Sequence, residues 1–127
     1  MNIPFPGDSF EMLIANHVLE HVGNDAVALA EIHRVLKPGG YAILQTPFST
    51  KLQHTWEDPG ISEDDMRLQA YGQADHVRLY GLDMIGRFAA AGLISQVCGH
   101  ARMLADFDPV MLGVNAEEPF LLFRASK

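Results

Sequence analysis

Apolar and polar positions along this chain predict strands joined by helices. Residues 12–15 form a short apolar run without alternation, which is typical of a strand covered on both faces. After a turn over residues 16–22, apolar positions recur at helical spacing until Pro38 and Gly39 end the helix. Residues 41–46 are the next apolar run. A strand, a helix and a strand with short connections predict a right-handed crossover between two parallel strands.

The remaining sequence predicts a long connection, another helix and two more strands. Residues 49–77 are mostly polar and are interpreted as a lid-like insertion, in which residues 62–65 predict a capping box that opens a short helix. A second amphipathic helix is expected over residues 83–91, with its apolar side formed by Leu82, Ile85, Phe88 and Ala89. Strands are expected at 94–101 and 120–125, as an antiparallel pair. Residues 1–127 are therefore interpreted as a single α/β domain.

Composition narrows the classes of partner. The chain has 127 residues, 48% hydrophobic and 20% charged, which suits a globular domain. Its formal net charge of −7 disfavours nucleic acid, so a small-molecule substrate is expected. No apolar run approaches the ~20 residues of a membrane span, so no membrane partner is expected. Cys98 is the single cysteine, which excludes an internal disulfide and favours a reducing, cytoplasmic setting.

Three motifs occur in a characteristic order. They are Ile3-Pro4-Phe5-Pro6, then the stretch 10–22, then Arg34-Val35-Leu36-Lys37-Pro38-Gly39-Gly40. Together they resemble the middle of a class I S-adenosylmethionine-dependent methyltransferase of the type 11 family, over about the first two fifths of the chain. The resemblance implies a partial Rossmann-like fold whose mixed sheet combines parallel strands with an antiparallel C-terminal strand. It also implies methyl transfer from S-adenosylmethionine to a small molecule that the sequence does not identify.

The same resemblance implies a cofactor site. It places Asn16 and His17 beside the methionine part of S-adenosylmethionine and Ile3 near the adenine. The family's glycine-rich loop and its acidic residue for the ribose have no counterpart in this sequence. The cofactor site is therefore expected to be incomplete, and the isolated chain is expected to bind S-adenosylmethionine weakly or not at all.

Polar and aromatic residues at the end of the insertion predict an acceptor pocket. The candidates for substrate contacts are Tyr71, His76, Arg78 and Tyr80, and the candidates for a catalytic base are His54, His76 and Tyr80. A base is needed only where the acceptor carries a proton at the reacting atom. An equal alternative is a capped turn with a His–Asp hydrogen bond, because polar groups in loops usually bond to one another.

His17, Glu20 and His21 have the H-x-x-E-H spacing of some zinc proteases. On a helix, His17 and His21 would share a face and bind a metal, with Glu20 as the base of a hydrolase. An apolar strand directly precedes His17, however, and short motifs often match by chance. The favoured interpretation has no metal: His17 lines the cofactor pocket while Glu20 and His21 shape the turn.

The strand from Met12 to Ala15 would lack its usual neighbour in this family. An apolar edge with unpaired backbone groups is rarely left open, so a homodimer that covers this strand is expected. This expectation leads to a second candidate function, that of a non-catalytic methyltransferase-like remnant serving as a dimerisation or partner-binding module.

Overall fold

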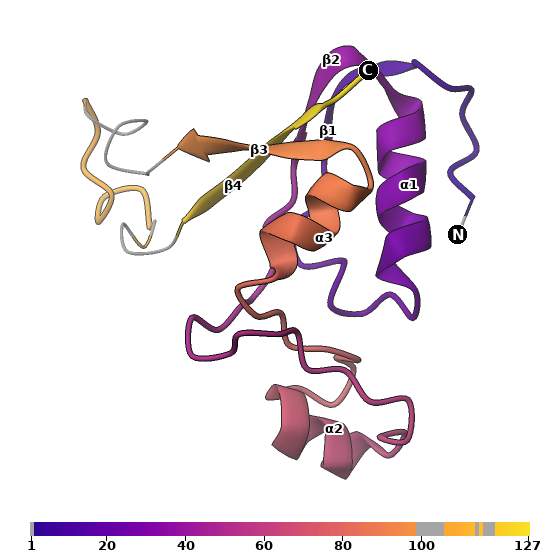
Figure 1. The fold of residues 1–127 in the computed structure, drawn as a ribbon. Coiled ribbons are helices and arrows are strands. Elements are labelled where there is room, and N and C mark those ends of the chain that lie inside the picture. Colours follow the sequence, from indigo (N-terminus) through magenta and orange to yellow (C-terminus); the bar gives the residue numbers. More distant parts are fainter. Residues whose placement is uncertain (1, 99–105, 114, 116–118) are drawn as a thin grey trace.

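The computed structural model describes residues 2–98, 106–113, 115 and 119–127. Its elements, in chain order, are β1 (Phe10–Ile14), α1 (Asp25–Val35), β2 (Leu36–Ile43), α2 (Asp64–Tyr71), α3 (Met84–Ala90), β3 (Leu93–Cys98) and β4 (Phe120–Ala125). Figure 1 shows one sheet with α1 and α3 beside it, while α2 stands apart from the sheet on the long connection between β2 and α3.

The four strands form one mixed sheet in the order β1-β2-β4-β3. The parallel pairing of β1 with β2 is confirmed, since Leu13 lies opposite Ala42 and Ile14 opposite Ile43. The expected antiparallel pair is confirmed as well: β4 pairs with β3, and it also pairs antiparallel with β2. The sequence-predicted strand 94–101 is described as Leu93–Cys98, and its last three positions lie outside the described residues.

Helix α1 begins as its sequence indicates but ends earlier. Asn24 caps it by accepting a hydrogen bond from the Val27 N–H at 3.1 Å. The helix ends at Val35, and residues 37–40 lie within β2 instead of forming a separate turn. The register with β1 shifts there, and Gly39 has a φ of 72°. The prediction that the helix ends before Pro38 was right. The residues around Pro38 and Gly39 form a bulge in β2 instead of a separate turn.

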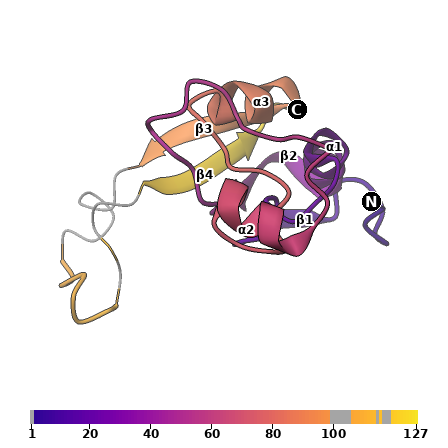
Figure 2. The same ribbon diagram turned by 90° about the horizontal axis from the view of Figure 1, so that it is seen from below.

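The core lies between the sheet and the pair of helices α1 and α3, which lie side by side (Figures 1 and 2). Phe88 of α3 packs edge-on against Tyr80, with ring centroids 5.8 Å apart, and against Phe123 of β4. Met84 and Phe88 form the buried side of α3, whereas Leu82 and Ile85 are exposed. The predicted apolar side of α3 was therefore wrong except at Phe88, because tertiary packing selected a neighbouring stripe.

The opposite face of the sheet is apolar and open. Cross-strand register places Met12, Tyr41, Arg124 and Ile94 in one row, and Ile14, Ile43, Leu122 and Gln96 in the next. Met12 is 55% exposed and Ile14 is 61% exposed. The expectation that residues 12–15 are covered on both faces is thus wrong for this chain, because no helix among the described residues packs on this face.

The long connection is anchored to the rest of the molecule by backbone pairing. Isolated β-bridges join Phe48 to Tyr80 and Trp56 to Leu79. The predicted helix inside it is present as α2, but Glu63 occupies its N-cap without a side-chain hydrogen bond, so the capping box was wrong. Among the described residues, no helix has the length and apolarity needed to cross a membrane.

Gly81 allows two parts of this connection to touch. A Cβ at Gly81 would lie 2.6 Å from the carbonyl carbon of His54, whereas a Cβ at Gly86 would meet nothing within 4 Å. Gly81→Ala should therefore lower the free energy of unfolding by about 1–3 kcal/mol, because backbone must move to admit the methyl group.

Gly86→Ala is the matched control. It lies inside α3 and should be neutral or stabilising by up to about 1 kcal/mol, given the helix propensity of alanine. Urea titrations of both variants measure the difference. Equal stabilities for the two variants would contradict the close approach at Gly81.

Candidate functional site

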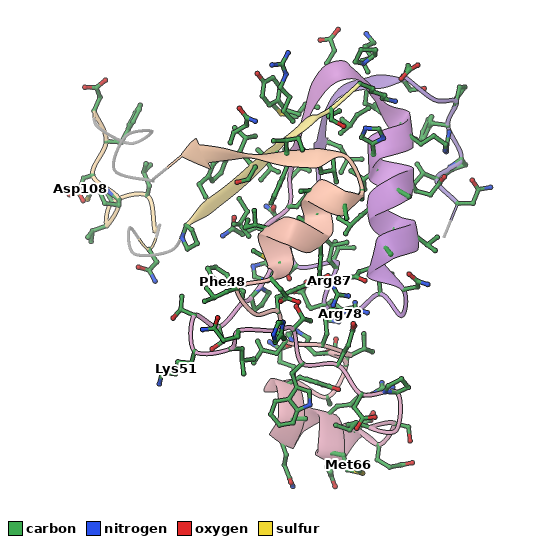
Figure 3. The ribbon with its side chains drawn as sticks, viewed as in Figure 1. Phe48, Lys51, Met66, Arg78, Arg87 and Asp108 are labelled. Atoms are coloured by element: carbon green, nitrogen blue, oxygen red, sulfur yellow. The ribbon has the colours of Figure 1, made fainter. Side chains whose placement is uncertain are left out.

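The carboxyl ends of the parallel strands enclose a cavity, at the edge of the sheet where Rossmann-like folds bind ligands. Pairing continues past β1, since the His17 N–H donates to the carbonyl of Gln45 at 2.7 Å. The cavity has a volume of about 380 Å³. Its lining consists of His17, Gln45, Thr46, Pro47, Phe48, Thr50, Asn115 and Pro119. Figure 3 labels Phe48 below the sheet, where β2 leads into the long connection.

His17 has an unusual backbone in this cavity wall. Its φ is 55°, in the left-handed region of backbone conformation that residues other than glycine rarely adopt. Its side chain is 65% exposed. Such a conformation costs about 1–2 kcal/mol and persists where the surrounding structure requires it, often at binding sites. The placement suits the role that the family resemblance implies for His17. The neighbouring Asn16 is also exposed.

Ile3 lies in a different environment. Its N–H donates to Glu31 Oε2 at 2.9 Å, and its carbonyl accepts from Arg34 at 3.0 Å. Hydrogen bonds from Arg34 and from the Ile3 N–H lower the pKa of the Glu31 carboxyl to about 2. These contacts fasten the N-terminal segment along α1, and the role of Ile3 near the adenine stays a prediction.

Residues 17–21 form turns and not a helix, so the helical H-x-x-E-H arrangement of His17 and His21 is wrong. Instead, Glu20, His21 and His76 come together, with one possible ligand atom from each lying within 4.8 Å of the others. Glu20 and His76 are buried, and the rings of His21 and His76 pack edge-on with centroids 4.7 Å apart. The sequence named His76 only as an acceptor contact or base.

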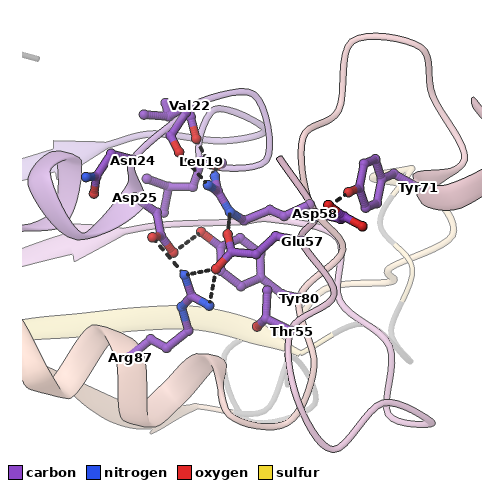
Figure 4. Close-up of polar contacts among 12 residues, drawn as sticks. Leu19, Val22, Asn24, Asp25, Thr55, Glu57, Asp58, Tyr71, Tyr80 and Arg87 are labelled. Carbon is purple, nitrogen blue, oxygen red and sulfur yellow. Dashed lines mark hydrogen bonds and ion pairs between the residues drawn. The ribbon is translucent and has the colours of Figure 1, made fainter. Parts of the chain in front are cut away.

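Two acceptor candidates have their polar groups bonded within the protein. Arg78 is 2% exposed, and it donates to the carbonyls of Leu19, Val22 and Gly23 and to Glu57 Oε2 (Figure 4). Tyr80 is fully buried, and its hydroxyl donates to Asp25 Oδ2 at 2.9 Å. These contacts support the alternative in which loop polar groups satisfy one another.

The other two candidates differ in exposure. Tyr71 is buried, and its hydroxyl accepts from the Asp58 N–H at 3.0 Å, which is again a contact within the long connection. His54 is exposed, and its carbonyl faces Gly81. Of the residues that the sequence proposed for catalysis or binding, His17 alone lines the cavity at the strand ends within the described structure.

Arg87 completes a charged network with Asp25 and Glu57. Its guanidinium donates to Asp25 Oδ1 at 2.8 Å and to Glu57 Oε1 at 2.9 Å (Figure 4). Burial by itself would raise the pKa of Asp25, but hydrogen bonds from Arg87 and Tyr80 outweigh it and hold that pKa below its ordinary value. Burial, with the adjacent Asp25 charge, raises the pKa of the Tyr80 hydroxyl. Asp25 is thus an anion and Tyr80 a neutral donor at pH 7.

Two further cavities are relevant to the site, and one of them shares part of its wall. One of about 700 Å³ lies between the start of α1 and the long connection, and Asp25, Glu57, Arg78 and Arg87 line it. Because these charges pair with one another, they offer little to an incoming ligand. The other cavity has a volume of about 340 Å³ and a mainly apolar lining. Phe48 and Pro119 line both this cavity and the strand-end cavity, so the two are neighbours. An apolar acceptor could lie there next to a ligand at the strand ends.

Sequence reasoning missed Gln45, Thr46 and Phe48. Gln45 is fixed by donating to the Pro119 carbonyl at 2.9 Å, and Thr46 donates to the buried Glu20 Oε2 at 2.9 Å. A signal was available, because these residues end the second predicted strand and carboxyl ends of parallel strands meet at one edge of a sheet.

Comparison with known proteins shows that the N-terminal third of the chain is similar to methyltransferases. Residues 1–44 match the family model described as a methyltransferase domain. A ubiquinone/menaquinone biosynthesis C-methyltransferase of Coxiella burnetii is 38% identical over 42 residues, which cover 33% of this chain and 17% of that protein. An uncharacterized methyltransferase of Schizosaccharomyces pombe is 44% identical over 39 residues, covering 31% of this chain and 14% of that protein. The chain therefore matches only a small part of these curated relatives.

Solved structures extend the similarity to the fold. A Burkholderia thailandensis 1,6-didemethyltoxoflavin-N1-methyltransferase, solved with its substrate and S-adenosylhomocysteine, superposes with a TM-score of 0.56 at 16% identity. The alignment covers 97% of this chain and 47% of that one. An S-adenosylmethionine-dependent methyltransferase from Mesorhizobium loti gives a TM-score of 0.55 at 16% identity, covering 97% of this chain and 63% of that one. The fold is thus that of Rossmann-like methyltransferases.

Tyr80→Phe tests the structural role of the buried network. Removing the hydroxyl leaves Asp25 Oδ2 without its donor, so the free energy of unfolding at pH 7 should fall by about 1–3 kcal/mol. The sign of the pH dependence follows from the lowered pKa of Asp25. A carboxyl with a lowered folded pKa contributes stability above its unfolded pKa of about 3.9, and that stability is lost as the pH falls further.

The loss caused by Tyr80→Phe should therefore shrink as the pH falls below about 4 and through the lowered folded pKa of Asp25, because the carboxyl needs the Tyr80 donor only while it is ionised. Tyr41→Phe is the control, because Tyr41 is exposed on the open face of the sheet and should change stability by less than about 0.5 kcal/mol. Chemical denaturation between pH 3 and pH 8 measures both. A pH-independent loss would show that Asp25 is not the partner that matters.

Proposed function

Because the chain carries the methyltransferase-domain signature and the fold of class I S-adenosylmethionine-dependent methyltransferases, we propose that it forms the C-terminal half of such an enzyme site. The substrate of that site is an unidentified small molecule, to which a methyl group is transferred. The single observation that supports this most is the cavity at the carboxyl ends of β1 and β2, with the strained His17 in its wall.

The chemistry suits these residues. S-adenosylmethionine supplies an activated methyl group, so the protein mainly has to hold the acceptor in line with it. His17 and Asn16 would face the methionine part of the cofactor at the end of β1. The apolar cavity beside Phe48 would hold the acceptor, since Leu82 and Ile85 also line it. No described residue is required as a base unless the acceptor must lose a proton.

The site is only half built by the residues present. Among the described residues, β1 is the edge strand of the sheet, so no further strand lies beside it at the strand-end cavity. In Rossmann-like sites a glycine-rich turn and an acidic residue hold the phosphate or ribose portion of the ligand. We therefore propose that the isolated chain binds the cofactor weakly and acquires activity only when that half is supplied. A reducing, cytoplasmic location remains a prediction.

Titration of the labelled chain with S-adenosylhomocysteine tests this function. Amide signals of residues 15–17, 45, 46 and 48 should shift, with saturation only at about millimolar ligand, because half of the contacts are missing. His17→Ala should weaken the shifts by several-fold, and His54→Ala, an exposed histidine outside the cavity, should leave them unchanged. Two-dimensional NMR measures both. Shifts confined to the cavity between α1 and the long connection, or no shifts at all, would reject the proposed site.

A second function is favoured by the open face of the sheet. Met12, Ile14 and Tyr41 are neighbouring exposed apolar side chains on β1 and β2, Ile94 lies beyond Arg124 on the same face, and β1 is the edge strand of the sheet among the described residues. Contiguous apolar surface of this kind usually marks an interface. We propose that two copies of the chain associate through this face around a two-fold axis, so that β1 of each copy is covered by the other.

Size-exclusion chromatography with light scattering tests the dimer. The unmodified chain should have the mass of a dimer at micromolar concentration. Ile14→Lys should give a folded monomer, because a charged side chain on the apolar face of the edge strand β1 cannot be buried in the interface without a partner. Val27→Lys places the same charge on the exposed surface of α1 and should remain dimeric. A monomeric parent chain would contradict the dimer without affecting the cofactor proposal.

A further inference from the structure

The turn after β1 and the end of the long connection bring three metal-binding side chains together. Glu20 and His21 come from the turn, and His76 comes from a position more than fifty residues later in the sequence. One ligand atom from each lies within 4.8 Å of the other two. The methyltransferase fold does not require such a cluster for methyl transfer, so its composition calls for a separate explanation.

The buried carboxylate of Glu20 is the strongest observation. Glu20 is 1% exposed, and its Oε2 accepts from Thr46 at 2.9 Å. Its Oε1 is buried and accepts no hydrogen bond from any described residue. His17 Nδ1 lies 3.3 Å from Oε1 but makes no hydrogen bond with it. A carboxylate oxygen without a donor in the interior is costly, and a cation is the partner it lacks.

His21 is oriented as metal-binding histidines commonly are. Its Nδ1 lies 3.3 Å from Asp75 Oδ2 and 3.2 Å from the Asp75 carbonyl oxygen, while its Nε2 faces Glu20 Oε1 at 3.9 Å. In metal sites the second ring nitrogen of a ligand histidine usually donates to a carboxylate or carbonyl in this way. That hydrogen bond fixes the tautomer and leaves Nε2 free to bind an ion.

We infer that Glu20, His21 and His76 form a binding site for a divalent transition metal of the zinc class. Two imidazoles and one carboxylate are ligands that Zn²⁺ accepts, whereas Mg²⁺ and Ca²⁺ prefer all-oxygen sites. A tetrahedral zinc ion holds its donors about 3.3–3.5 Å apart, so the three groups need to close by roughly 1 Å. His21 can supply that movement because its side chain is 34% exposed.

The bound ion would add a further link between two segments that Arg78 already joins through the carbonyls of Leu19, Val22 and Gly23. The Val77 N–H donates to the Glu20 carbonyl at 2.9 Å directly beside the cluster. A metal there would hold the end of the long connection against the turn after β1. Because Thr46 bonds Glu20 and also lines the strand-end cavity, the ion would lie just behind the wall of the proposed cofactor site. Glu20 would act as a ligand, which leaves it unavailable as the base of a hydrolase.

Calorimetric titration of the chain with zinc chloride tests the inference. The expected result is one Zn²⁺ per chain, no heat with magnesium chloride, and a higher Tm in the presence of Zn²⁺. His21→Ala should weaken zinc binding by more than about 100-fold, because one of three ligands is lost. His54→Ala, which removes an exposed histidine elsewhere in the long connection, should bind zinc as the parent does.

A variant at an exposed position tests whether a loss of zinc binding is caused by unfolding. Asp75→Asn changes a side chain that is 71% exposed and removes the negative charge beside His21 Nδ1, while the Asp75 carbonyl can still accept from that nitrogen, so zinc affinity should fall by no more than about 10-fold. Circular dichroism without metal verifies that each variant is folded. The inference is overturned if zinc does not bind stoichiometrically, or if His54→Ala weakens binding as much as His21→Ala.

Discussion

The buried guanidinium of Arg78 is the interaction on which the site depends. A cation in the interior costs several kcal/mol unless it is fully bonded, and Arg78 meets that need with three carbonyls of the turn after β1 and with Glu57. Because the carbonyls and Glu57 come from different segments, one side chain fixes the turn relative to the long connection. The same arrangement holds the end of the long connection, which carries His76, beside Glu20 in the turn.

Helices cover one face of the sheet, and no helix among the described residues covers the other face. The helices α1 and α3 seal a core around Leu29, Phe88 and Phe123. The opposite face presents apolar rows that start at Met12 and Ile14, on the strand that also ends at the proposed cofactor cavity. Whatever covers β1 therefore also stands beside that cavity. The proposed association and the proposed cofactor binding would be coupled by this geometry, because both would use the same edge of the sheet.

Local signals predicted the elements, and long-range packing corrected their details. The spacing of apolar residues and the Asn24 cap identified α1, and the strand predicted at 120–125 has the observed bounds of β4, Phe120–Ala125. Helix periodicity could not decide which stripe of α3 is buried, since Met84 and Phe88 were selected by contacts with Tyr80 and the sheet. The residues around Pro38 read locally as a turn, yet pairing with β1 draws them into β2.

The sequence by itself determined the family signature, the parallel pairing of β1 with β2 and the position of His17 at a strand end. These properties depend on residues close together in the chain, where periodicity, capping and turn chemistry act. The tertiary structure alone decided that Tyr80 and Arg78 are buried network members and that His76 lies against Glu20 and His21. Such contacts join segments far apart in sequence, and only the packing of the whole chain can bring them together.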